Sequence, residues 1–140
     1  MGTTEKTILI VDDDVDFRDS VTVVLEAQGY KVAGAGSAKE ALASVSASKP
    51  DLVVLDIMME NDSAGYEVNQ AIKFREEFQL AREVPILMVS SIPLDPAARF
   101  DRSAEVQMIT PDFYMTKPLN FSIFLEKVRS LLEKNQAFAQ

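Results

Sequence analysis

The sequence predicts an α/β fold in which five strands alternate with five helices, (βα)5, around a parallel sheet. Apolar runs with the character of buried strands alternate with segments whose apolar residues fall at helical spacing. The runs within 7–11, 51–56 and 84–89 are almost continuously apolar, which is typical of strands that helices cover on both faces. The expected strands cover residues 7–11, 30–35, 51–56, 84–89 and 113–116.

The expected helices lie between these strands and after the last one. The first covers about 14–28, because its apolar residues have helical spacing and Gly29 follows as a stop signal. Ser37 and Glu40 form a capping-box pattern that opens a second helix, which ends near Lys49. The remaining helices are expected at about 66–78, 96–107 and 121–134, with the last residues fraying.

The composition limits the class of protein. A chain of 140 residues with 47% hydrophobic residues suits one domain, which we expect to span 1–140 with its core at about 7–134. The formal charge of −8 argues against a general binder of nucleic acids or anionic membranes, because phosphate contacts need Lys and Arg. The absence of Cys and His excludes thiol chemistry, a thiolate metal site and a phosphohistidine on this chain. Neither a secretory signal nor a membrane-spanning run is recognisable, so we expect a cytoplasmic protein without membrane insertion.

Polar or charged residues follow four of the expected strands. Asp12 and Asp13 end the first, Asp56 ends the third, Ser90 ends the fourth and Lys117 ends the fifth. Because ligands bind at the carboxyl ends of parallel strands, we expect these side chains to meet in one crevice. Asp14 comes next in the sequence, and we interpret it as the N-cap of the first helix.

The residue types in this group indicate metal and phosphoryl chemistry. Three clustered carboxylates repel one another and favour a bound cation, and ligands that offer only oxygen select Mg²⁺ or a similar hard ion. Asp56 is the candidate nucleophile, since an aspartate can form an acyl-phosphate. Ser90 can donate a hydrogen bond to a phosphoryl oxygen, and Lys117 can pair with a carboxylate and then with a phosphate. The Lys117–Pro118 bond is a candidate cis peptide that would turn the lysine into the site.

Over essentially its whole length, the chain resembles the response-regulator receiver domain of two-component signalling. The resemblance rests on ILIVDDD (8–14), LVVLDIMM (52–59), VPILMVSS (84–91) and FYMTKPL (113–119). Each motif is weakly specific alone, but their order and their positions at strand ends are strongly specific together. The resemblance implies a doubly wound, flavodoxin-like (βα)5 fold with strand order 2-1-3-4-5.

The resemblance also implies roles for individual residues. Asp56 would be the phosphoacceptor. Asp13 would bind Mg²⁺ directly, Asp12 would bind it through water, and the backbone carbonyl of Met58 would complete the metal site. Lys117 would act as the lysine of the family's site.

Two further pairs of positions follow from the same resemblance. Ser90 would be the switch hydroxyl, and Tyr114 the aromatic residue that turns inward on activation. Met58 and Ile92 would flank the path of the water that hydrolyses the acyl-phosphate. Both side chains are apolar, so we expect slow autodephosphorylation.

The implied partners are a histidine kinase or a histidine phosphotransfer protein as phosphodonor, and an unidentified protein that receives the signal. The implied protein catalyses only its own phosphorylation and dephosphorylation. The chain departs from the family pattern after Asp56, where Glu60 follows Met59 and Gly65 comes one residue late, and the stretch between Ser90 and Lys117 is longer than usual.

Three alternatives remain open at this point. The chain can be a receiver-like interaction module that phosphorylation does not regulate, or a receiver fragment of a longer regulator, although it closes cleanly after its last expected helix. A Mg²⁺-dependent phosphatase is the third, but such sites use a second acid two residues past the nucleophile, where this chain has Met58.

Overall fold

The computed structural model of the chain describes residues 6–57, 64–81, 83–90 and 113–139. These residues hold five strands that form one parallel sheet in the order β2-β1-β3-β4-β5, which confirms the predicted fold class. The strands are β1 (Thr7–Val11), β2 (Lys31–Ala35), β3 (Leu52–Asp56), β4 (Ile86–Ser90) and β5 (Phe113–Thr116).

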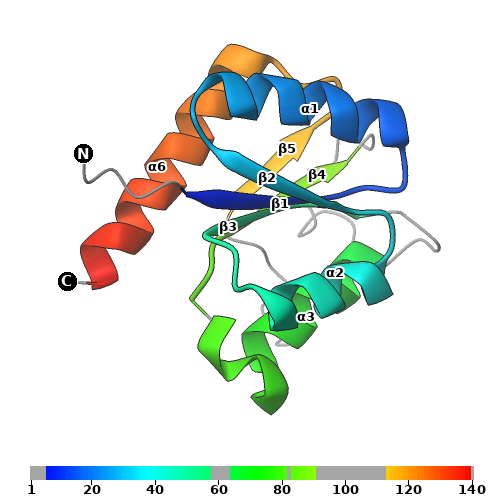
Figure 1. Cartoon of the computed structure of the whole chain (residues 1–140), viewed down its shortest axis with the longest axis vertical. Coiled ribbons are helices and arrows are strands. Elements are labelled where there is room, and N and C mark those ends of the chain that lie inside the picture. Colours follow the sequence, from blue (N-terminus) through cyan, green and yellow to red (C-terminus); the bar gives the residue numbers. More distant parts are fainter. Residues whose placement is uncertain (1–5, 58–63, 82, 91–112, 140) are drawn as a thin grey trace, which may run out of the picture.

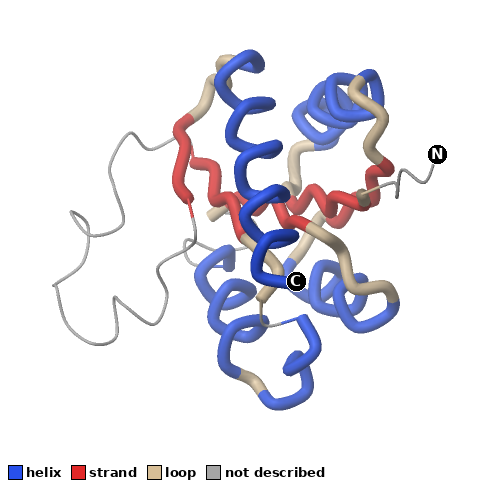
Figure 2. Tube along the Cα trace, turned by 90° about the vertical axis from the view of Figure 1, so that its left-hand side faces the viewer, coloured by secondary structure: helices blue, strands red, loops and turns tan. Residues whose placement is uncertain are grey.

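Helices cover both faces of the sheet. Helices α1 (Val15–Ala27) and α6 (Phe121–Ala139) pack on one face, and α2 (Ala38–Ala47) and α3 (Ala64–Phe74) on the other. In Figure 1, α1 lies above the sheet and α2 and α3 lie below it. The perpendicular view shows the same arrangement, with helices on either side of the strands (Figure 2). Because β1, β3 and β4 lie inside the sheet, almost every residue in them is buried, as their continuous apolar sequences predict.

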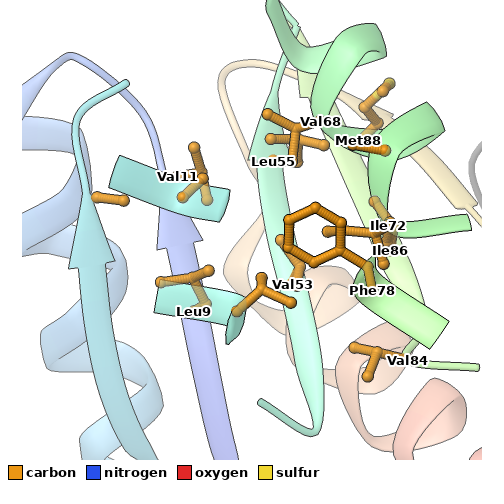
Figure 3. Packing of buried hydrophobic residues seen from close by; sticks show 14 of the residues in the cluster. Leu9, Val11, Val53, Leu55, Val68, Ile72, Phe78, Val84, Ile86 and Met88 are labelled. Carbon is orange, nitrogen blue, oxygen red and sulfur yellow. The ribbon is translucent and has the colours of Figure 1, made fainter. Parts of the chain in front are cut away.

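Two hydrophobic clusters hold these layers together. On the face of α2 and α3, Phe78 packs with side chains of β3, α3 and β4, among them Val53, Ile72 and Ile86 (Figure 3). On the opposite face, alternate residues of the same strands meet Val21 of α1 and Phe124 of α6, which are completely buried. Because side chains alternate along a strand, the strands contribute residues to one cluster on each side of the sheet.

The ends of α1 and α2 follow the predicted capping signals. The Asp14 side chain accepts a hydrogen bond from the backbone nitrogen of Phe17 at 3.2 Å, and Gly29 adopts a φ of 93° two residues after α1 ends. Ser37 accepts from the backbone nitrogen of Glu40 at 3.2 Å. The Glu40 carboxylate accepts from Gly36 at 2.9 Å, one residue earlier than in the usual capping box.

The prediction of one helix over 66–78 was wrong. The structure has α3 up to Phe74 and then a short 3-10 helix, η1 (Glu76–Ala81), with a kink at Phe78. Continuing the buried stripe of α3 by three or four residues from Ile72 would bring Arg75 and Glu76 onto the sheet, and their charges disfavour burial. The break lets Phe78 enter the core, where it is 5% exposed.

Other boundaries differ less from the expected ones. β2 and β4 start one and two residues later than expected, and β4 includes Ser90. The last helix runs to Ala139, beyond the expected end at about 134, and the expected fraying of the last residues stays a prediction. The helix expected at 96–107 lies outside the described residues. Among the helices that are described, none combines the length and apolar character needed to cross a bilayer.

Candidate functional site

The three carboxylates predicted at the strand ends lie together. The register that pairs Val11 with Leu55 places Asp12, directly after β1, beside Asp56, the last residue of β3. One ligand oxygen from each of Asp12, Asp13 and Asp56 lies within 4.8 Å of the others. Asp12 and Asp56 are buried, at 1% and 7% exposure, whereas Asp13 is exposed. The cluster is therefore a donor set made only of oxygen, open to solvent on the side of Asp13.

Lys117 supplies positive charge to this cluster. Its Nζ lies 2.8 Å from Oδ2 of Asp12 and 3.9 Å from Oδ1 of Asp56. The backbone nitrogen of Lys117 donates a 2.7 Å hydrogen bond to the carbonyl oxygen of Ser90, which ties the end of β5 to the end of β4. The Lys117–Pro118 peptide is cis, as the sequence suggested.

Asp12 is held on several sides. Its Oδ1 accepts from the backbone nitrogen of Asp14 at 2.9 Å, and its Oδ2 accepts from Lys117. Its backbone carbonyl accepts from Nη1 of Arg18 at 2.7 Å, and its backbone nitrogen donates to Ala35 at 3.0 Å. Both carboxylate oxygens of Asp12 thus already have donors within the protein.

Ser90 and Tyr114 lie on neighbouring strands. Ser90 is the last residue of β4, is 1% exposed, and pairs in register with Thr116. Tyr114 pairs with Met88 and packs, partly buried, against the cluster on the face of α2 and α3. Tyr114 therefore lies two positions before the residue of β5 that pairs with Ser90. Met58 and Ile92 lie outside the described residues.

Gly65 sets the junction between β3 and α3. A Cβ atom built on Gly65 would collide with the carbonyl oxygen of Asp56 and lie 2.6 Å from Cα of Ile57. The backbone nitrogen of Gly65 donates to the carbonyl of Ile57 at 2.7 Å. In the sequence, Gly65 stands out only because it comes one residue later than in the family pattern. Its close approach to Asp56 is visible only in three dimensions.

Asn69 was also missed. It is fully buried in α3, and among the described residues neither its Oδ1 nor its Nδ2 has a hydrogen-bond partner. A sequence signal existed, because Asn69 occupies an i+4 position from Gly65 and lies beside Val68 in the buried stripe of the helix.

Comparison with known proteins identifies the family. The sequence model of the response regulator receiver domain matches residues 8–129. The chain belongs to this family. Phosphorylation and Mg²⁺ binding are general properties of its members in two-component systems. The match includes all four strand ends that carry the clustered site.

The curated relatives are longer proteins. The phosphate regulon transcriptional regulatory protein PhoB of Pseudomonas aeruginosa is 32% identical over 129 residues, which are 92% of this chain and 52% of PhoB. The transcriptional regulatory protein YvrH of Bacillus subtilis is 35% identical over 128 residues, which are 91% of this chain and 49% of YvrH. The chain therefore spans about half the length of these relatives.

Solved structures with the same fold include a receiver domain and part of a longer protein. A CheY-like response regulator receiver domain protein from Methanospirillum hungatei superposes with a TM-score of 0.75 at 29% identity, covering 96% of this chain and 98% of that one. NtrX from Brucella abortus in complex with ATP gives a TM-score of 0.79 at 26% identity, covering 97% of this chain and 29% of NtrX.

Proposed function

We propose that the chain is a phosphoacceptor receiver domain, which takes a phosphoryl group onto Asp56 from a histidine kinase or a histidine phosphotransfer protein. The observation that carries this proposal is the position of the Asp56 carboxylate, 3.9 Å from the Lys117 ammonium and clustered with two further carboxylates. A nucleophilic carboxylate beside a fixed cation and a metal-binding set of oxygens is what phosphoryl transfer to aspartate requires.

The donor set suits Mg²⁺. Three carboxylates without nitrogen or sulfur ligands favour a hard cation that keeps several waters. Because both oxygens of Asp12 have donors within the protein, Asp13 and Asp56 are the residues we assign to direct coordination, with Asp12 acting through water. The backbone carbonyl of Met58 is the third proposed protein ligand. A bound Mg²⁺ would neutralise charge on the carboxylates and on the phosphoryl oxygens.

The residues of this chain have distinct tasks in the transfer. A carboxylate oxygen of Asp56 bonds to phosphorus while the P–N bond of the donor phosphohistidine breaks, and the electron pair of that bond stays on the donor imidazole. The Lys117 ammonium lies close enough to Asp56 to stabilise the phosphoryl oxygens as the new bond forms. In this proposal the chain catalyses only its own phosphorylation and dephosphorylation.

The response to phosphorylation is assigned to Ser90 and Tyr114. The Ser90 hydroxyl would donate to a phosphoryl oxygen, and Tyr114 would turn inward, which shifts the population between two existing states. Their positions on adjacent strands support this coupling, since a movement at the end of β4 reaches β5 directly. The altered surface would then bind a partner protein.

The extent of the whole protein bears on its partners. We assign residues 1–140 to one receiver domain with a core at about 7–134. Relatives such as the DNA-binding response regulator MtrA of Mycolicibacterium smegmatis extend well beyond the matched region, which favours a receiver fragment of a longer regulator as the second candidate. The proposal that the domain itself does not bind nucleic acid rests on its formal charge of −8.

Phosphorylation by a small phosphodonor tests the assignment of Asp56. The wild-type protein, Asp56→Asn and the matched control Asp19→Asn, which changes an exposed aspartate of α1, are incubated with acetyl phosphate and Mg²⁺ and weighed by intact-mass spectrometry. We expect wild type and Asp19→Asn to gain one phosphoryl group and Asp56→Asn to gain none. A phosphoryl group on Asp56→Asn would overturn the assignment, and a wild-type protein that gains none would favour the unphosphorylated interaction module.

A further inference from the structure

An aromatic ring of α1 contacts the lysine of the site. Nζ of Lys117 lies 4.2 Å from the centroid of the Phe17 ring, within the range of a cation–π contact. Phe17 is half-buried and packs at the edge of the cluster on the face of α1 and α6. Among the described residues, the ammonium therefore contacts Asp12, Asp56 and this ring.

A ring holds the ammonium without adding negative charge. The site already has three carboxylates, and two more precede Phe17, at the N-cap (Asp14) and in the first turn of α1 (Asp16). A further carboxylate would repel an incoming anionic phosphodonor and would compete with it for Lys117. The electron-rich face of an aromatic ring attracts the ammonium but carries no net charge.

The ring also limits where the lysine can go. Lysine has a flexible four-carbon stem, and the side chain of Lys117 is 21% exposed, so without a lateral contact its ammonium can sample water. Phe17 belongs to the same apolar stripe as Val21 and Leu25, which packs α1 onto the sheet. This packing sets the position of the Phe17 backbone, from which the ring reaches Lys117.

We infer that Phe17 is a positioning residue that holds the Lys117 ammonium between Asp12 and Asp56 for phosphoryl transfer. The inference rests on the proposed function and adds to it a residue that touches neither the phosphoryl group nor the metal. An aliphatic side chain at position 17 would preserve the packing of α1 but lose the attraction for the ammonium.

The test compares Phe17→Leu, which removes the ring, with Phe17→Tyr, which keeps it. Val21→Ala is the control for stability, because Val21 is buried in the same stripe. The first readout is the NMR shift of the Lys117 methylene protons next to Nζ, which a nearby ring face moves upfield. The second is the rate of phosphorylation by acetyl phosphate with saturating Mg²⁺, and thermal unfolding confirms that each variant is folded.

We expect the upfield shift in wild type and Phe17→Tyr, and its loss in Phe17→Leu. Phosphorylation of Phe17→Leu should slow about two- to fivefold, the size of a partly exposed cation–π contact. Phe17→Tyr and Val21→Ala should stay close to wild type. If Phe17→Leu keeps both the shift and the rate, or loses the shift without losing rate, the positioning role is wrong. If the wild type takes no phosphoryl group, the proposed function fails and this inference falls with it.

Discussion

The Nζ atom of Lys117 lies 2.8 Å from Oδ2 of Asp12, a carboxylate whose side chain is only 1% exposed. Asp12 follows β1 and Lys117 follows β5, so this ion pair joins two strands that are not neighbours in the sheet. The same Nζ also lies 3.9 Å from Oδ1 of Asp56. Lys117 therefore stabilises the ends of the strands as well as the chemistry proposed there.

We expect Lys117→Met to lower the free energy of unfolding by about 1–3 kcal/mol, less than for a fully buried pair because Lys117 is partly exposed. The substitution removes the ammonium that pairs with Asp12 and lies near Asp56. Mg²⁺ should replace part of that charge, so it should stabilise Lys117→Met more than wild type. Urea unfolding with and without Mg²⁺ measures this difference, with exposed Lys39→Met as the control. Equal stabilisation of all three proteins by Mg²⁺ would contradict the argument.

Gly65→Ala should destabilise the protein by about 1–3 kcal/mol, because the added methyl group meets backbone atoms of Asp56 and Ile57 that have little room to move. The displaced end of β3 should also slow phosphorylation of Asp56. Gly34→Ala is the matched control, since its Cβ would meet only the Arg18 side chain at an ordinary 3.5 Å. Urea unfolding and the acetyl phosphate assay check both effects. A Gly65→Ala protein as stable as Gly34→Ala would show that the junction yields more easily than the structure indicates.

The sequence predicted the features that depend on local pattern and on the rule for parallel strands. Apolar runs predict the strands, and the convergence of their carboxyl ends predicts that Asp12, Asp13 and Asp56 lie together, as they do. Asp14 and Ser37 marked the starts of two helices because capping is a local interaction.

Features that depend on tertiary packing were not predictable in the same way. The helix break before η1 arises because Phe78 packs in the core while Arg75 stays exposed, a choice that helical periodicity alone does not reveal. The contact of Phe17 with Lys117 joins residues that are far apart in the chain. Helical spacing places Phe17 in the apolar stripe of α1, and only the position of β5 gives its ring a second role.

Asn69→Leu should raise the free energy of unfolding by about 1–3 kcal/mol. The amide of Asn69 is buried and, within the described part of the chain, has no hydrogen-bond partner, so a side chain of similar shape without polar atoms removes a desolvation cost. Asn69→Asp, which places a charge at the same position, should destabilise the protein instead. Thermal and urea unfolding give both values. A loss of stability in Asn69→Leu would reveal a hydrogen bond to Asn69 in solution, such as one from a buried water.

The phosphorylated state should be long-lived. Met58 lies two residues past Asp56 and Ile92 two residues past Ser90. From the resemblance to receiver domains, we expect both positions to flank the path of the hydrolytic water. Neither side chain can orient a water by hydrogen bonds, and both can exclude it from the acyl-phosphate. We therefore expect a Met58→Asn, Ile92→Glu double variant to lose its phosphoryl group faster than wild type after the phosphodonor is removed. Intact mass followed over time measures the decay, and Met58→Leu with Ile92→Val, which keeps both positions apolar, should decay like wild type. Similar decay of the polar double variant and wild type would show that another step limits hydrolysis.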